Sequence, residues 1–211
     1  MSRIRCIISD YGGVLTAPIG HSWRIWARNE GLDIELFERV MADLWVGGKD
    51  EALGTGLELG TVSQPELERY LAERLRYADS SPVLPHGLID RLWAALRGEP
   101  DMVGVLRRAK RSGYLVALLS NSWGMGYDRT GWDELFDAVV LSGDIGMRKP
   151  EPEIYRHVAE LLQVEPPECV FIDDLSANVR GAAAVGMVGI HHIGVDTTIA
   201  ELEALLGGQL R

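Results

Sequence analysis

Short apolar runs alternate with amphipathic segments through the second half of the chain. Four runs have the length and the branched side chains of buried strands, at residues 114–120, 138–142, 169–173 and 188–193. Four segments around them carry apolar residues at steps of three and four, at residues 102–113, 151–163, 177–186 and 198–206. These segments are predicted to be helices. Strands joined by helices of this length predict a parallel sheet with right-handed crossovers.

The first half of the chain has a different pattern. A strand is predicted at residues 4–8, where apolar residues dominate, and its natural place is in the same sheet. Four amphipathic helices are predicted after it, at residues 22–31, 34–45, 64–77 and 89–96. Ser63 and Glu66 have the spacing of a capping box at the start of the third helix.

These elements combine into one predicted architecture. We expect an α/β fold with a Rossmann-like parallel five-stranded sheet, built from residues 1–16 and 98–211. Residues 17–97 would form an all-helical cap inserted after the first strand. A length of 211 residues and an apolar fraction of 46% fit one domain that carries such an insertion.

Composition and charge narrow the classes of partner. A formal net charge of −10 repels phosphate backbones, so we expect no nucleic acid partner. No apolar run approaches the length of a membrane span or a signal peptide core, which favours a cytoplasmic protein. Cys6 and Cys169 lie within apolar runs and are expected to be small buried hydrophobes. The pattern does not decide between a monomer and a homodimer.

Polar residues follow three of the five predicted strands. They are Asp10 after the first, Ser120 and Asn121 after the second, and Asp173 and Asp174 after the fourth. Because parallel strands end at one edge of a sheet, these side chains are expected to share a crevice. Converging carboxylates repel one another unless a cation lies among them, and oxygen ligands suit Mg²⁺.

Three more residues extend this candidate site. Gly12 and Gly13 follow Asp10 at once, so the backbone can turn sharply and approach a ligand without a Cβ in the way. Lys149 precedes a proline that begins a predicted helix, and it would bring a fixed positive charge to the same edge.

Each side chain also has an ordinary structural interpretation. Asp10 could simply begin a turn, and Lys149 could be a solvated surface residue. The other polar residues could be helix caps, with a dipole contact for the paired aspartates. Their order along the chain, each at a strand end or a helix start, favours a common site.

The motifs "ALLSNSWG", "IGMRKPEPEIY" and "VFIDDLSANVRGAAAVGM" resemble those of the haloacid dehalogenase superfamily, in the branch whose helical cap follows the first strand. The resemblance covers nearly the whole chain and is strongest over residues 114–192. Within the superfamily, these motifs particularly resemble those of the N-terminal phosphatase domain of mammalian soluble epoxide hydrolases and of related bacterial sugar-phosphate phosphatases. The motifs are specific for the superfamily and say little about the substrate.

The resemblance implies a Mg²⁺-dependent phosphatase that acts on a small phosphorylated metabolite. Asp10 would be the nucleophile that forms an aspartyl-phosphate. Mg²⁺ would be held by Asp10, the Gly12 carbonyl and Asp174, and supported by Asp173 and Asn178. The transferring oxygens would be bound by the Gly12 and Gly13 backbone and by Ser120, Asn121 and Lys149.

The chain departs from the family pattern at Gly12. Most phosphatases of the superfamily carry a second Asp two residues after the nucleophile, and this Asp protonates the leaving oxygen. Here the metal-binding carbonyl is retained and the acid is absent, which leaves the source of the proton open.

Two other functions are compatible with the motifs. A 2-haloacid dehalogenase would use the same carboxylate without a metal, but Asp173 and Asp174 would then face an anionic substrate unpaired. A phosphate-ligand-binding protein that has lost turnover is a second alternative, which Gly12 favours.

The cap is expected to determine the substrate by closing over the strand ends. Trp23, Trp26 and Trp45 are interpreted as core residues of the cap rather than as surfaces that stack on a sugar. Residues 22–26 and 42–56 contain aromatic residues and glycines that would line and hinge the cap. His191 and His192 end the last strand, and the sequence assigns them no further role.

Overall fold

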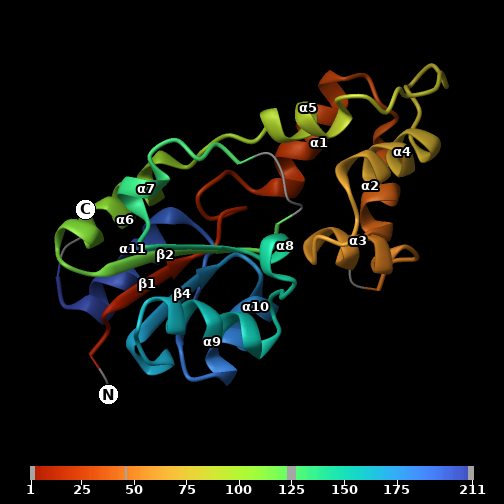
Figure 1. Ribbon diagram of the computed structural model, residues 1–211. Coiled ribbons are helices and arrows are strands. Elements are labelled where there is room, and N and C mark those ends of the chain that lie inside the picture. Colours follow the sequence, from red (N-terminus) through yellow and green to blue (C-terminus); the bar gives the residue numbers. More distant parts are fainter. Residues whose placement is uncertain (1–2, 46, 123–126, 209–211) are drawn as a thin grey trace.

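The computed structural model describes residues 3–45, 47–122 and 127–208. A five-stranded sheet in the order β3-β2-β1-β4-β5 forms its centre, and each neighbouring pair of strands is parallel (Figure 1). The strands are β1 (Cys6–Ser9), β2 (Leu115–Ser120), β3 (Ala138–Leu141), β4 (Cys169–Asp173) and β5 (Val188–His191). This sheet confirms the predicted α/β fold.

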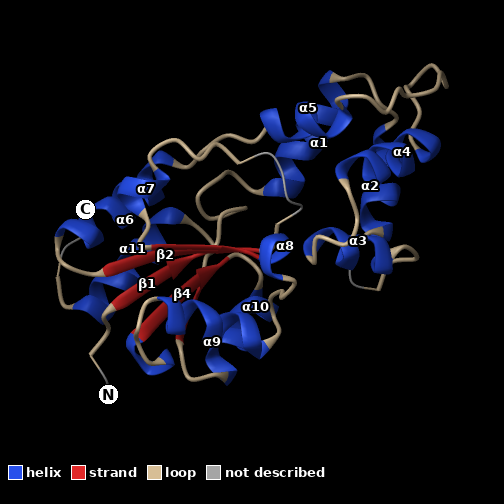
Figure 2. Cartoon of the chain, in the orientation of Figure 1, coloured by secondary structure: helices blue, strands red, loops and turns tan. Residues whose placement is uncertain are grey.

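Helices cover both faces of the sheet, because alternate strand residues point to opposite sides (Figure 2). Ile7 packs with the helices of one face, α6 (Pro100–Arg111), α7 (Trp132–Leu135) and α11 (Val195–Leu206). Ile8 packs with those of the other face, α9 (Pro152–Leu161) and α10 (Ser176–Ala184). Cys6 and Cys169 are both buried and free, as expected.

Five helices lie between β1 and α6 in the chain, and we call them the inserted helices. They are α1 (Ile19–Asn29), α2 (Ile34–Asp43), α3 (Glu51–Glu58), α4 (Gln64–Arg74) and α5 (Leu88–Ala94). They form a separate lobe with its own apolar core, which contains Trp23 and Trp26 (Figure 1). The predicted capping box of α4 is present, and the Ser63 N–H donates to Glu66 Oε2 at 2.8 Å.

The chain enters and leaves the inserted helices through two segments that run side by side. Thr16 and Gly98 form an antiparallel bridge. The Ala17 N–H donates to the Arg97 carbonyl at 2.8 Å, and the Glu99 N–H donates to the Leu15 carbonyl at 2.7 Å. The boundaries 1–16, 17–97 and 98–211 stay a prediction for how the chain divides into domains.

The structure differs from the sequence predictions in several places. Trp45 is 40% exposed and so is not part of the core, because it lies just beyond the end of α2. The helix α3 overlaps the segment predicted to line and hinge the cap, and no helix is predicted there. The short helices α7 and α8 (Ser142–Ile145) have no predicted counterpart, and α8 directly follows β3. A helix of one turn has no periodic pattern that the sequence could reveal.

None of the described helices is long and apolar enough to cross a membrane. The cytoplasmic location and the oligomeric state stay predictions.

Candidate functional site

Asp10 lies at the middle of the sheet edge where the strands end. It directly follows β1, the central strand, and its N–H donates to the Ile172 carbonyl of β4 at 2.9 Å. Only 7% of Asp10 is exposed. Burial raises the pKa of this carboxyl to about 7, against the pull of the Lys149 ammonium and with the repulsion of Asp173. Burial thus disfavours the charged form of Asp10, and a nearby cation would stabilise that form.

The Lys149 ammonium is fully buried among oxygen atoms. Its Nζ donates to Asp10 Oδ1 at 2.7 Å, to Asp173 Oδ2 at 2.6 Å and to the Leu119 carbonyl at 3.0 Å. Burial acts to lower the pKa of Lys149, but the two carboxylates outweigh it and the pKa is raised. A permanently charged ammonium thus lies against the predicted nucleophile.

The Asn121 side chain holds the backbone of Lys149. Its Nδ2 donates to the Lys149 carbonyl at 3.0 Å, and its Oδ1 accepts from the Lys149 N–H at 2.8 Å. The resemblance implies a contact between this amide and the transferring oxygens. In the structure both ends of the amide bond the Lys149 backbone, so Asn121 anchors the residue that carries the ammonium, and its contact with the transferring oxygens stays a prediction.

Asp173 is completely buried, and its carboxylate is surrounded by donors. Oδ1 accepts from the Leu175 N–H at 2.8 Å and from Asn178 Nδ2 at 3.0 Å, and Oδ2 accepts from Asn178 at 3.1 Å as well as from Lys149. Asn178 and the Leu175 N–H thus hold the Asp173 carboxylate in place, and the supporting role of Asp173 and Asn178 toward Mg²⁺ stays a prediction.

Asp174 is less buried, and its carboxylate packs on the turn after β1. A Cβ built on Gly13 would lie 2.4 Å from Asp174 Oδ2, and Gly13 has a φ of +77°, so only glycine fits there. The pKa of Asp174 is raised to about 6 by burial and then by the Asp173 carboxylate. The backbone at Gly13 thus lies close to the Asp174 carboxylate.

The three carboxylates form a group that fits a divalent cation. One oxygen from each of Asp10, Asp173 and Asp174 lies within 4.8 Å of the others. Hard carboxylate oxygens are the ligands that Mg²⁺ prefers, and one ammonium offsets only part of their charge.

Ser120 is buried at the end of β2, where its Oγ lies 2.9 Å from the Tyr127 Oη. Tyr127 also contacts the ring of Tyr11, with centroids 4.8 Å apart. No role for Tyr127 is predicted from the sequence, because nothing in the neighbouring residues marks it as lying near a strand end.

The Gly12 position is not open. A Cβ built there would lie 2.3 Å from the Cδ1 atom of Ile19 in α1. A side chain at position 12 therefore requires Ile19 to move, which the flexible end of its side chain permits.

The two histidines at the end of β5 brace the turn that carries the aspartates. His191 Nε2 lies 2.9 Å from the Asp174 carbonyl oxygen, and the His192 N–H donates to the Asp173 carbonyl at 2.9 Å. Their sequence shows only the end of a strand, since the contact depends on how β5 pairs with β4.

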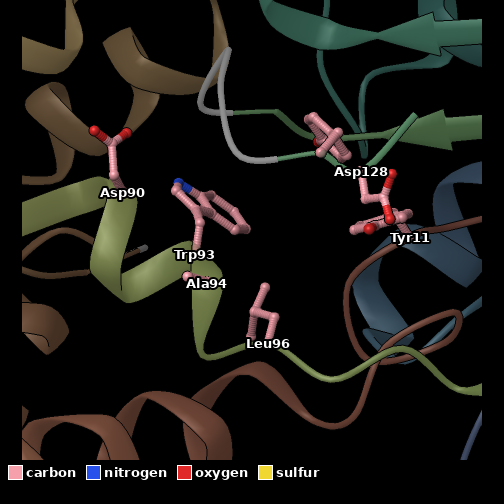
Figure 3. Close-up of a pocket in the computed structure, with 7 residues that line it drawn as sticks. Tyr11, Asp90, Trp93, Ala94, Leu96 and Asp128 are labelled. Atoms are coloured by element: carbon pink, nitrogen blue, oxygen red, sulfur yellow. The ribbon is translucent and has the colours of Figure 1, made fainter. Parts of the chain in front are cut away.

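A pocket of about 470 Å³ lies between α5 and the segments that follow β1 and β2 (Figure 3). It is lined by Tyr11, Asp90, Trp93, Ala94, Leu96, Tyr127 and Asp128. The carboxylates of the candidate site do not line it, so the pocket lies beside that site.

Comparison with known proteins identifies the family. Residues 4–186 match the family described as haloacid dehalogenase-like hydrolases. The chain belongs to this family. Its members are hydrolases, and the enzyme class and the resemblance predicted from the motifs are confirmed.

Curated relatives of the family include phosphatases. The chain is 37% identical over 117 residues to the sesquiterpene phosphatase astK of Aspergillus oryzae, which covers 53% of this chain and 59% of the relative. It is 27% identical to bifunctional epoxide hydrolase 2 of Sus scrofa, over 98% of this chain and 40% of the relative. It is 28% identical to Phosphatase MT3486 of Mycobacterium tuberculosis, over 97% of this chain and 98% of the relative.

The chain thus spans about half the length of the first two relatives and nearly all of the third. A solved structure confirms the fold. A haloacid dehalogenase family enzyme from Bacteroides thetaiotaomicron, crystallised with magnesium and inorganic phosphate, superposes with a TM-score of 0.68 at 22% identity. The superposition covers 89% of this chain and 93% of that enzyme.

Proposed function

We propose that this chain hydrolyses small phosphomonoesters with the help of Mg²⁺, through a phosphorylated Asp10. The observation that carries the proposal is the group of three carboxylates within 4.8 Å of one another, with the Lys149 ammonium beside two of them. Such a group needs a further cation before an anionic substrate can approach. The phosphatases among the relatives support the same reaction.

Asp10, Asp174 and the Gly12 carbonyl would hold the Mg²⁺, with Asp173 beside them. The ion would supply positive charge that offsets the charge of the phosphate. Asp173 has its oxygens occupied by Asn178, Leu175 and Lys149, so it keeps Lys149 in place more than it binds the ion.

The reaction begins with the carboxylate of Asp10. Its Oδ1 accepts the Lys149 hydrogen bond, and no hydrogen bond from the described residues reaches Oδ2. Oδ2 attacks phosphorus, the bond between phosphorus and the ester oxygen breaks, and the alcohol leaves. Water then attacks phosphorus, the bond to Asp10 breaks, and phosphate is released.

Lys149 and Ser120 stabilise the charge that develops on the phosphoryl oxygens. Both are fixed before the substrate arrives, Lys149 by Asn121 and Ser120 by Tyr127. Preorganised donors of this kind lower the barrier because they do not need to reorient during the reaction. The phosphoryl group would also lie against the backbone of Gly12 and Gly13.

Gly12 has no acidic side chain, so the departing oxygen takes its proton from water. This feature favours a second candidate function, a protein that binds phosphorylated ligands and turns them over slowly or not at all. A 2-haloacid dehalogenase is disfavoured, because Lys149 pairs with Asp10 and Asp173, and without a metal the Asp174 carboxylate would face the anionic substrate.

The proposal is tested with an aryl phosphate and with the Asp10→Asn variant. We expect phosphate release that requires Mg²⁺, and a phosphoenzyme that survives an acid quench, is cleaved by hydroxylamine and is absent in the variant. Loss of turnover in Asp10→Asn with an unchanged melting temperature supports the assignment. Full activity in that variant, or in the presence of excess chelator, would contradict the assignment. Tight phosphate binding without turnover would support the binding protein instead, and release of chloride from chloroacetate would support a dehalogenase.

A further inference from the structure

We call the five-stranded sheet with helices α6 to α11 the sheet unit. The inserted helices contact the sheet unit through an ion pair at the end of α3. Glu58 is the last residue of α3, and Arg148 lies between α8 and α9. Arg148 Nη1 donates to Glu58 Oε2 at 3.1 Å and to Thr55 Oγ1 at 2.7 Å. This contact joins two segments that are separated by about ninety residues, and Figure 1 shows α3 facing α8.

The ion pair is largely withdrawn from water. The Arg148 and Glu58 side chains are 14% and 13% exposed, whereas Arg24 and Glu38, paired within the inserted helices, are 54% and 44% exposed. Burial raises the pKa of Glu58, against the pull of Arg148 and of the Asn121 amide. A buried pair contributes far more to position than an exposed one, because an unpaired buried charge is costly.

The backbones around this pair fit together closely. The Ser142 hydroxyl at the start of α8 donates to the Glu58 carbonyl at 2.5 Å, and it accepts from the Ser122 N–H at 2.8 Å. A Cβ built on Gly60 would lie 2.3 Å from the Gly143 carbonyl oxygen. The end of α3 therefore has a defined position on the sheet unit.

This position is connected to the nucleophile in three steps. Glu58 pairs with Arg148, the residue next to Arg148 is Lys149, and the Lys149 ammonium donates to Asp10 at 2.7 Å. Asn121 adds a parallel route, since it holds the Lys149 backbone and also faces Glu58.

We propose that Glu58 and Arg148 are positioning residues that tie the inserted helices to the sheet unit and set the place of the Lys149 ammonium on Asp10. In its effect on catalysis, this inference rests on the proposed phosphatase function. Glu58 and Arg148 have this positioning role as a pair, and neither residue has it alone.

The test is a double-mutant cycle with Glu58→Gln and Arg148→Met. The control is Glu30→Gln, which removes an ion pair between Glu30 and Arg91 inside the inserted helices. We expect kcat for an aryl phosphate to fall about 10-fold or more in each single variant, with a smaller change in KM. The double variant should be no worse than the poorer single variant, because the two residues act through each other. The control should stay close to the natural protein.

A second measurement separates this inference from the proposed function. Small-angle X-ray scattering should show a larger radius of gyration for Glu58→Gln than for the natural protein and for Glu30→Gln, whether or not the chain is a phosphatase. A retained Mg²⁺-dependent rise in melting temperature would show that the variants fold. Multiplicative effects on kcat, or an unchanged radius of gyration, would overturn the inference. If the natural protein has no activity, the proposed function fails and the scattering result alone decides.

Discussion

At the scale of single residues, Gly13 is the position in the turn after β1 where a side chain has no room. Its φ is +77°, and an added Cβ would meet the Asp174 carboxylate at 2.4 Å. Gly13→Ala should displace Asp174, weaken Mg²⁺ binding, and destabilise the fold by about 1–3 kcal/mol. Gly20→Ala in α1 is the matched control, because its Cβ would meet nothing within 4 Å. Mg²⁺ titration of phosphate release and thermal unfolding check both variants, and equal Mg²⁺ affinities would contradict the prediction.

Under the proposed function, Gly12 should determine how the rate of hydrolysis depends on the leaving group. General acid catalysis typically contributes about 100- to 10,000-fold, and it matters most when the leaving oxygen is strongly basic. The natural chain should therefore hydrolyse aryl phosphates far faster than alkyl phosphates. Gly12→Asp, combined with Ile19→Ala to make room, should raise activity selectively on the alkyl esters.

The measurement is a plot of log(kcat/KM) against the leaving-group pKa for both forms, with Ile19→Ala alone as the control. A flat line for the natural chain would show that another group donates the proton, and Gly12 would not be a missing acid.

At the scale of elements, the packing of α10 on the loop before α9 depends on Gly181. An added Cβ would lie 2.6 Å from the Pro150 carbonyl oxygen and 2.9 Å from the Tyr155 hydroxyl. Gly181→Ala should cost about 1–3 kcal/mol, because backbone rather than a flexible side chain must move. Gly104→Ala in α6 meets only the end of Arg108 and should be neutral or stabilising by about 0.5–1 kcal/mol. Denaturant midpoints at an unchanged m-value measure the difference, and equal midpoints would refute it.

The elements also show what the sequence could predict. The strands were predicted because their apolar runs are bounded by polar residues, and Asp10, Asp173 and Asp174 follow from the rule that parallel strands end together. The contact between Lys149 and Asp10 spans 139 positions and depends on the path of a loop, so no local pattern contains it. The same holds for the Asn121 amide, whose type suits either a phosphate or a backbone partner.

At the scale of the whole molecule, the carboxylate cluster links stability, pH and Mg²⁺. The pKa of Asp10 is raised to about 7 and that of Asp174 to about 6, both above their values in an unfolded chain. The folded protein without metal therefore binds more protons than the unfolded chain, and its stability should fall as pH rises from about 4 to about 7.

Mg²⁺ requires the ionised carboxylates, so the stabilisation that it gives should grow over the same range. At a concentration 100 times Kd, this stabilisation is about 2.7 kcal/mol. Melting temperatures with and without Mg²⁺ should differ more at pH 8 than at pH 5.5, and Asp174→Asn should remove most of the difference. A shift of the same size at both pH values would show that protons and metal do not compete.

The paired segments at Leu15–Ala17 and Arg97–Glu99 determine how easily the inserted helices could be replaced in evolution. Because the chain leaves the sheet unit and returns to it at neighbouring hydrogen-bonded residues, residues 18–96 can be exchanged without stretching any strand. A short turn between 17 and 97 should give a folded sheet unit that retains the carboxylates but loses Glu58. A lobe of another shape grafted at the same two residues should keep the full rate only if it supplies a partner for Arg148 in place of Glu58.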